Sequence, residues 1–218
     1  MKIKLLLDED VSLQKDCNLC QEVALNVGQK TNYGSVIIYK TGNSLQEDWF
    51  ATISPKTGGN PEEDFTIQLM PLAHLTHFSQ LSAYPQLAKN YGIAFSRLSA
   101  ALTELMAEKE FYPRAETREF STSVATYGKC TTWKDKKEHL HLKIFPFRNA
   151  IGQPYTVDST FEKKEVHKNQ KTGEEFVQMK PVHKVFIPPE RFEHLSKKLI
   201  ELLKRLNCYN DRPPYPHK

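Results

Sequence analysis

The segment HLHLKIFPF, His139–Phe147, constrains the fold of this chain more than any other stretch, because aliphatic and polar residues alternate along it. Successive side chains of a β-strand point to opposite faces of the sheet. One face of this strand would therefore carry leucine and isoleucine, and the other would carry His139, His141 and Lys143. The aliphatic face requires a hydrophobic core behind it. The polar face is either an ordinary exposed surface or a site built from two imidazoles and an ammonium group.

The composition is that of a folded protein with a mild positive charge. The chain has 218 residues, of which 39% are hydrophobic, and its 12 Phe and 9 Tyr exclude a disordered chain. This length suits one domain with an appendage, or two small domains. The formal net charge of +4 is compatible with an anionic small molecule. It falls short of the Lys/Arg clustering that indicates nucleic acid.

Four further segments are apolar, rich in β-branched and aromatic residues, and bounded by turn-forming residues, which predicts strands. Three of them precede a helical stretch and one follows it: Gly34–Lys40, Asp48–Ser54, Asp64–Met70 and Thr122–Gly128. Apolar residues spaced three and four apart predict a helix over Gly92–Lys109. We therefore expect an α+β domain over residues 1–149, with an antiparallel sheet and packed helices.

Residues 150–218 read as a C-terminal extension. Its first part is polar and rich in Lys and Glu, and predicts a hairpin around KNQKTGEE. An amphipathic helix is expected from Pro189 to Asn207, with a leucine stripe on one face and Pro188-Pro189 at its start. We expect the stripe to dock on the preceding domain. A homodimer interface is the less favoured alternative.

The sequence predicts a soluble, cytoplasmic protein with no membrane partner. No apolar run approaches the roughly 20 residues that span a bilayer. The N-terminal MKIKLLLDEDV has no signal-peptide core and no small-residue cleavage site. The four cysteines are too sparse for a secreted disulfide scaffold.

The motif CNLC, Cys17 to Cys20, supplies two thiolates that can bind one tetrahedral zinc ion. The alternative is a redox pair on a thioredoxin-like fold. No βαβ pattern surrounds the motif and no Trp or Pro flanks it, which favours the metal. A zinc site needs two more ligands. Either His74 or His77 can supply the third, and His139 can supply the fourth.

The order of these motifs resembles the histidine-triad superfamily of nucleotide hydrolases and transferases. Cys-x-x-Cys is followed by a strand, by Pro-x-x-His at 71–74, by a helix and by His-x-His-x, over residues 17–149 in all. The resemblance implies a histidine-triad-like antiparallel sheet stabilised by a structural zinc ion. It assigns the zinc to Cys17, Cys20, His74 and His139. It also implies that His141 is a nucleophile, which attacks the α-phosphorus and forms a covalent nucleotidyl-histidine.

A second match is TISP, Thr52–Pro55, at the end of a predicted strand. Similar proteins carry Asp-Ile-Ser-Pro there, and this strand holds the ribose and flanks the base. The resemblance thus implies nucleotide binding by Thr52, Ile53 and Ser54. The residue at the Asp position is Thr52, which offers one hydroxyl in place of a carboxylate.

Two positions depart from the family pattern. Lys143 replaces the third histidine, and its ammonium group can bind a non-bridging phosphate oxygen with a full charge. Upstream, the segment TWKDKKE replaces the Gln-Ser/Thr-Val of many hydrolases. The residues that can substitute for it are Thr131, Thr132, Lys134 and Lys136.

The first expected function is a nucleotidyl hydrolase or transferase that acts on nucleoside polyphosphates, such as dinucleotides, through His141 and Lys143. The alternative is a zinc-stabilised module that binds a nucleotide or a protein partner with weak or no turnover. A third function, nucleic-acid end processing, is disfavoured because the C-terminal extension mixes both signs of charge: residues 151–218 hold 13 Lys/Arg and 9 Asp/Glu.

Overall fold

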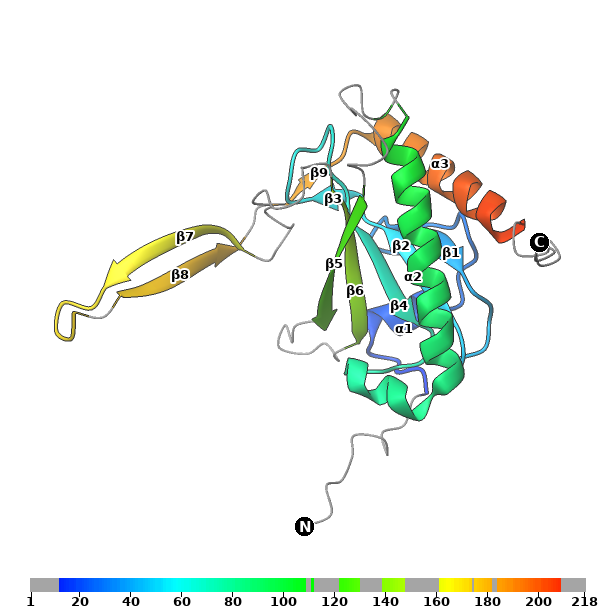
Figure 1. Ribbon diagram of the computed structural model, residues 1–218, viewed down its shortest axis with the longest axis horizontal. Helices are drawn as coiled ribbons and strands as arrows, with labels where there is room; N and C mark the ends of the chain where they lie inside the picture. Colours follow the sequence, from blue (N-terminus) through cyan, green and yellow to red (C-terminus); the bar gives the residue numbers. More distant parts are fainter. Residues whose placement is uncertain are drawn as a thin grey trace, which may run out of the picture.

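A five-stranded antiparallel sheet, in the order β1-β2-β4-β6-β5, forms the centre of the computed structural model (Figure 1). The structure describes residues 12–108, 111, 122–129, 139–147, 161–173, 175–181 and 184–208. Its elements are α1 Asn18–Glu22, β1 Val36–Lys40, β2 Trp49–Ile53, β3 Lys56–Thr57, β4 Ile67–Pro71, the 3-10 helix η2 Phe78–Ala83, α2 Pro85–Met106, β5 Thr122–Lys129, β6 Leu140–Phe147, β7 Phe161–Lys168, β8 Glu175–Pro181, β9 Val185–Phe186 and α3 Pro189–Cys208. The expected α+β class with an antiparallel sheet is confirmed.

The five predicted strands all belong to this sheet, with small shifts at their ends. Helix α2 differs more, because it begins at Pro85 and not at Gly92. Proline is well suited to the first turn of a helix, where its missing N–H has no partner to lose. Gly92 lies inside the helix, where a glycine lowers stability by about 1 kcal/mol relative to alanine without ending the helix.

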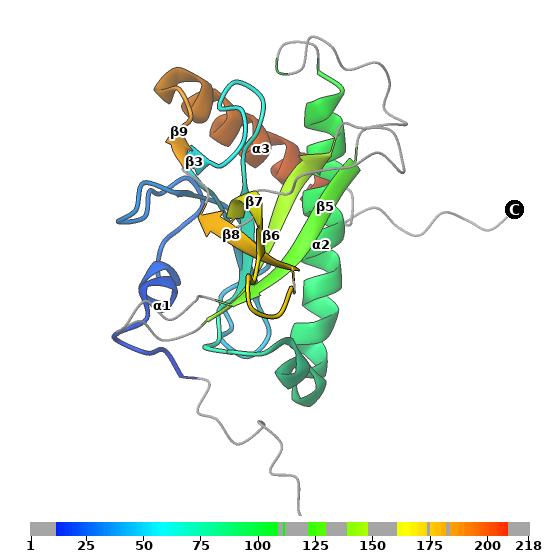
Figure 2. The ribbon, with the colours of Figure 1, turned by 90° about the vertical axis from the view of Figure 1, so that its left-hand side faces the viewer.

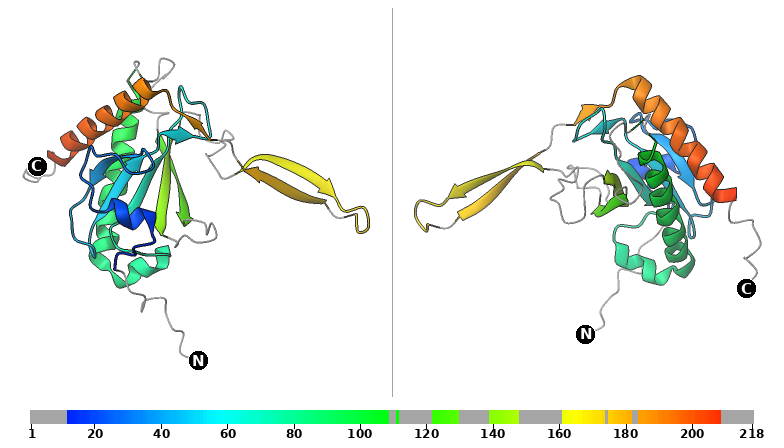
Figure 3. Two further views of the ribbon diagram at one scale, coloured as in Figure 1. Left: turned by 180° about the vertical axis from the view of Figure 1, so that it is seen from behind. Right: turned by 45° about the horizontal axis from the view of Figure 1, so that its top comes forward.

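The two faces of the sheet carry different layers. Helices α2 and α3 contribute to a large cluster with the aliphatic side chains of the strands, including Leu140, Leu142 and Ile144 of β6. The opposite face carries a smaller cluster, to which Val23, after α1, belongs together with Ile37, Phe50, Met70 and Leu72. Figure 3 shows α1 on the face of the sheet that α2 does not cover. The alternation predicted for β6 is therefore confirmed, because its aliphatic side chains lie in the main core.

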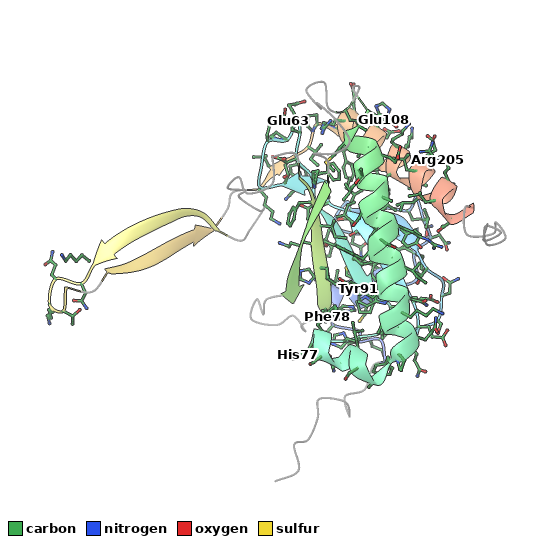
Figure 4. The ribbon with its side chains drawn as sticks, in the orientation of Figure 1. Glu63, His77, Phe78, Tyr91, Glu108 and Arg205 are labelled. Atoms are coloured by element: carbon green, nitrogen blue, oxygen red, sulfur yellow. The ribbon has the colours of Figure 1, made fainter. Side chains whose placement is uncertain are left out.

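Helix α3 docks on the rest of the chain through its leucine stripe, as predicted. Leu195 and Leu199 are fully buried in the same cluster as the residues of the sheet. An ion pair of 3.1 Å between Lys198 Nζ and Glu108 Oε1 joins α3 to the end of α2. Glu108 is labelled in Figure 4. None of the described helices has the length and apolar character needed to cross a membrane.

Two small two-stranded sheets lie outside the central sheet. Strands β7 and β8 form the predicted hairpin, which projects away from the body of the molecule in Figure 1. Strand β3, just after β2, pairs with β9, just before α3. Seen from the β5 edge in Figure 2, the β3–β9 ribbon and α1 lie on the same side of the sheet, and α2 lies on the other.

Candidate metal centre and nucleotide-binding face

Two cysteine sulfurs meet at the start of α1. Cys17 is the N-cap residue of this short helix and Cys20 lies in its first turn, so the three-residue spacing turns both side chains to one side. Both cysteines are buried, and neither is in a disulfide. Lys40 on β1 donates a hydrogen bond of 3.0 Å from Nζ to the carbonyl oxygen of Val23, which holds the end of α1 on the sheet.

Two histidines reach the same point from neighbouring strands. His74 follows β4 and His139 precedes β6, and these strands pair in the sheet. The backbone N–H of Leu140 donates to the carbonyl oxygen of Leu75 at 2.6 Å, which brings the start of β6 beside the segment that carries His74. The two imidazole centroids lie 5.2 Å apart, edge to face.

The four side chains form one buried group, with one ligand atom of each residue within 4.8 Å of every other. Cys20 Sγ lies 3.2 Å from His74 Nδ1 and 3.6 Å from His139 Nδ1. Cys17 Sγ lies 3.4 Å from His139 Nδ1. A tetrahedral ion with Zn–S bonds of about 2.3 Å and Zn–N bonds of about 2.0–2.1 Å places S and N about 3.6 Å apart. The observed separations fit a Cys2His2 metal centre made by these residues.

The surroundings of the group also suit a metal. The Nε2 of His139 lies 3.2 Å from the carbonyl oxygen of Pro71. A proton on Nε2 would be donated to that carbonyl, which leaves the lone pair of Nδ1 directed at the sulfurs, as in many histidine-metal sites. The pKa of the Cys17 thiol is strongly lowered, chiefly by a hydrogen bond from Cys20 and further by His139 and His74, although burial opposes it. The resulting thiolate is the form that binds a metal.

His77, the alternative third ligand, does not belong to this group. It is the N-cap residue of η2 and lies beside Phe78 at the lower end of the molecule (Figure 4). Its Nδ1 lies 2.8 Å from the hydroxyl of Thr76. Of the two histidines that the sequence left open, His74 is the one that meets the cysteines.

His141 is buried two residues further along β6, on the same face as His139. Its Nδ1 lies 3.2 Å from the carbonyl oxygen of His139, to which a proton on Nδ1 would be donated. The pKa of His141 is lowered to about 4, chiefly by burial and further by the charges of Lys143, His139 and Lys184, although this hydrogen bond opposes the shift. At neutral pH the imidazole is therefore uncharged. None of the described residues hydrogen-bonds to its Nε2.

A row of cross-strand partners connects Lys143 to the predicted ribose strand. Thr52 on β2 pairs with Gln68 on β4, and Gln68 pairs with Lys143 on β6. Directly paired residues of an antiparallel sheet share a face, so all three belong to the face that carries His141. Their side chains carry a hydroxyl, an amide and an ammonium group; Thr52 is buried, at 1% exposed, and Gln68 and Lys143 are half-buried.

The other residues of TISP have different surroundings. The Ile53 side chain is fully buried in the main cluster beneath α2, so only its backbone is near the Thr52 face. The Ser54 hydroxyl donates to the carbonyl oxygen of Lys56 at 2.9 Å and accepts from its N–H at 3.1 Å. Strand alternation accounts for Ile53, because the residue next to Thr52 must point to the opposite face.

Gln68 was not among the predicted site residues. The sequence feature that could have indicated Gln68 is that it is the only amide in the apolar strand IQLMP. The alternation of this strand places it on the face opposite the core. The register between β2, β4 and β6 is what assigns it to the row, and register was not predicted. The upstream residues Thr131, Thr132, Lys134 and Lys136 lie outside the described residues.

Comparisons of the chain with protein-family models, with curated proteins and with solved structures found no match in any of the three.

Proposed function

We propose that this protein is a nucleotidyl hydrolase or transferase with a histidine-triad-like site and a structural zinc ion. The observation that supports it most is the arrangement around His141. A buried, uncharged imidazole with its Nδ1 against a carbonyl oxygen lies two residues from Lys143, and Lys143 is in one row with Thr52. A nucleophile, a cation for phosphate and a hydroxyl for ribose thus share one face.

In the proposed reaction the lone pair of His141 Nε2 attacks the α-phosphorus of a nucleoside polyphosphate. A P–N bond forms, the P–O bond to the remaining phosphate or nucleotide breaks, and the leaving oxygen departs with the bonding electrons as a phosphate anion. Water or another acceptor hydroxyl then attacks the phosphorus. The P–N bond breaks, its electrons return to Nε2, and the acceptor loses its proton to solvent. Lys143 stabilises the negative charge on the non-bridging oxygens in both steps.

Cys17, Cys20, His74 and His139 would hold the zinc ion, which supplies structural cross-linking in this proposal. With all four positions taken by protein ligands, the centre has the closed coordination typical of structural zinc. The ligand residues hold the start of β6 against α1. They thereby position the backbone carbonyl of His139, which accepts the hydrogen bond from His141.

The test is intact-protein mass spectrometry after mixing with dinucleoside polyphosphates and nucleotide sugars. We expect a mass increase of one nucleotidyl group on the wild type and none on His141→Ala. His194→Ala, which changes an exposed histidine on α3, serves as the matched control and should label like the wild type. Zinc content and the circular dichroism spectrum of the folded protein should be unchanged in both variants. Full turnover by His141→Ala on a substrate of the wild type would refute the covalent mechanism.

A second candidate function is a zinc-stabilised nucleotide-binding module without turnover, and the observation in its favour is Lys143 at the third triad position. Partner binding through the leucine stripe of α3 is not supported, because Leu195 and Leu199 are buried within the chain. If neither the wild type nor Lys143→His labels or turns over with a nucleotide that both bind, the binding module replaces the enzyme.

A further inference from the structure

The β3–β9 ribbon lies directly beside the predicted ribose strand. Strand β2 ends at Ile53, and β3 starts at Lys56, which pairs with Phe186 of β9. The backbone N–H of Ile187 donates to the carbonyl oxygen of Pro55 at 2.9 Å, so β9 is anchored on the TISP segment itself. In Figure 2 the ribbon is on the α1 side of the sheet. His141 points to this side as well, because its neighbours Leu140 and Leu142 point into the main core on the other side.

Strand β9 presents an aromatic ring to solvent at this point. Phe186 is 67% exposed, the largest fraction for a large apolar side chain among the described residues. The ammonium group of Lys56 lies 4.4 Å from the centroid of its ring. Exposing an apolar ring to water is unfavourable in free energy, and the four residues of the ribbon are too few to cover it. An aromatic face beside a cation is the kind of surface on which nucleobases stack.

A second cation belongs to the same segment. Lys184 is exposed and lies two residues before Phe186, and residues two apart in an extended segment share a face. Lys56, which lies over the ring of Phe186, is exposed as well. Two cations therefore accompany the exposed ring of the β3–β9 ribbon, and such a surface attracts an anion.

We propose that β9 forms part of the nucleotide site, with Phe186 stacking on the base and Lys184, two residues before it, binding a phosphate group of the nucleotide. This rests on the proposed function and deepens it. Phosphate would lie near His141 and Lys143, ribose near Thr52, and base at the β3–β9 ribbon.

The test separates base from phosphate by using two probes, AMP and ribose 5-phosphate, titrated calorimetrically into the full-length protein. Phe186→Ala should weaken AMP binding by about fivefold to 100-fold, the range for loss of one stacked base, and should leave ribose 5-phosphate within about twofold of the wild type. Lys184→Gln should weaken both probes. Lys171→Gln is the matched control for Lys184→Gln, since Lys171 is an exposed lysine in the turn between β7 and β8, and it should bind like the wild type.

Equal AMP affinity in Phe186→Ala and wild type would overturn the proposal, as would a wild type that binds neither probe. Equal weakening of both probes by Phe186→Ala would also overturn it, because that pattern reports a displaced β9. A different result would contradict the enzymatic proposal and leave the β9 proposal standing. If the wild type binds AMP with the expected pattern but forms no nucleotidyl adduct from dinucleotides, β9 belongs to the site of a binding module.

Discussion

Lys143 occupies the position of the third histidine in the proposed triad-like site. In its row with Gln68 and Thr52 it places a cation on the face that carries His141. A permanent charge stabilises the extra negative charge that develops on phosphate oxygens in the transition state. The same charge helps to keep His141 uncharged, which preserves its nucleophilic lone pair.

We predict that Lys143→Ala lowers the rate of adduct formation by about 10²–10³, the effect of losing one preorganised donor. Lys143→His should recover part of this loss, and Lys143→Gln should shift the balance from hydrolysis towards transfer. Rapid quenching followed by intact mass gives the rates. Lys171→Ala, at the exposed hairpin turn, is the control. Labelling of Lys143→Ala at the wild-type rate would show that Lys143 has no role in charge stabilisation.

For single residues, the sequence predicted the site best where the spacing between residues within one element places their side chains together. Alternation in β6 predicted which side chains share a face, and the spacing of Cys17 and Cys20 predicted a shared ligand site. The contribution of Gln68 and of Phe186 depends on which strands are neighbours and in what register. That information is set by long-range pairing, which local residue patterns do not contain.

The element that ties the metal centre together is α1, a helix too short to be stable alone. It is held by the packing of Val23 on Phe50 and by the hydrogen bond from Lys40. A bound metal would add direct links from α1 to the segments that carry His74 and His139. Metal binding to such a centre contributes to the folding free energy, since the unfolded chain holds no preformed site.

We therefore predict about one zinc ion per chain, which Cys17→Ala should release. The melting temperature should fall by about 2–4 °C for each kcal/mol lost, as expected for a chain of this size. Chelation of the wild-type protein should produce a similar decrease and should have little further effect on the variant. Elemental analysis and calorimetry measure the two quantities. Cys208→Ala, outside the group of four, is the control. Purified protein without zinc, with Cys17 and Cys20 joined in a disulfide, would contradict the prediction.

The length of each helix or strand determined whether it could be predicted from the sequence. The long amphipathic helices and the five sheet strands have enough residues for a period to be recognised. Strands β3 and β9 have two residues each, and α1 has five. Elements this short exist because the surrounding structure holds them, so their own sequences carry little signal.

For the whole molecule, the main core includes residues from both parts of the predicted division at residue 149. Leu199 of α3 belongs to the same cluster as Ile144 of β6 and Leu98 of α2. An element that completes a core cannot be removed without exposing the surface that it covers. We expect the sheet and α3 to unfold together.

The prediction is that Leu199→Ala lowers the free energy of unfolding by about 2–5 kcal/mol, the range for a buried leucine, and that unfolding remains one transition. Lys204→Ala, on the exposed side of α3, should change it by less than about 0.5 kcal/mol. Urea titration followed by both tryptophan fluorescence and circular dichroism measures these changes. Two separate transitions, with Leu199→Ala affecting one of them, would show that residues 150–218 fold independently.

The pairing of β3 with β9, and the cover that α3 gives to the sheet, also have a consequence for biosynthesis. The ribosome makes the chain from its N-terminus, so the sheet strands emerge well before residues 185–208. During this interval the nascent chain has an aliphatic sheet face that is only partly covered, and chaperones bind such surfaces. Contacts between segments this far apart in sequence also form slowly, because a long loop must close first. In the proposed nucleotide site, the part that β9 contributes would form only after residues 185–186 have been made and have paired with β3.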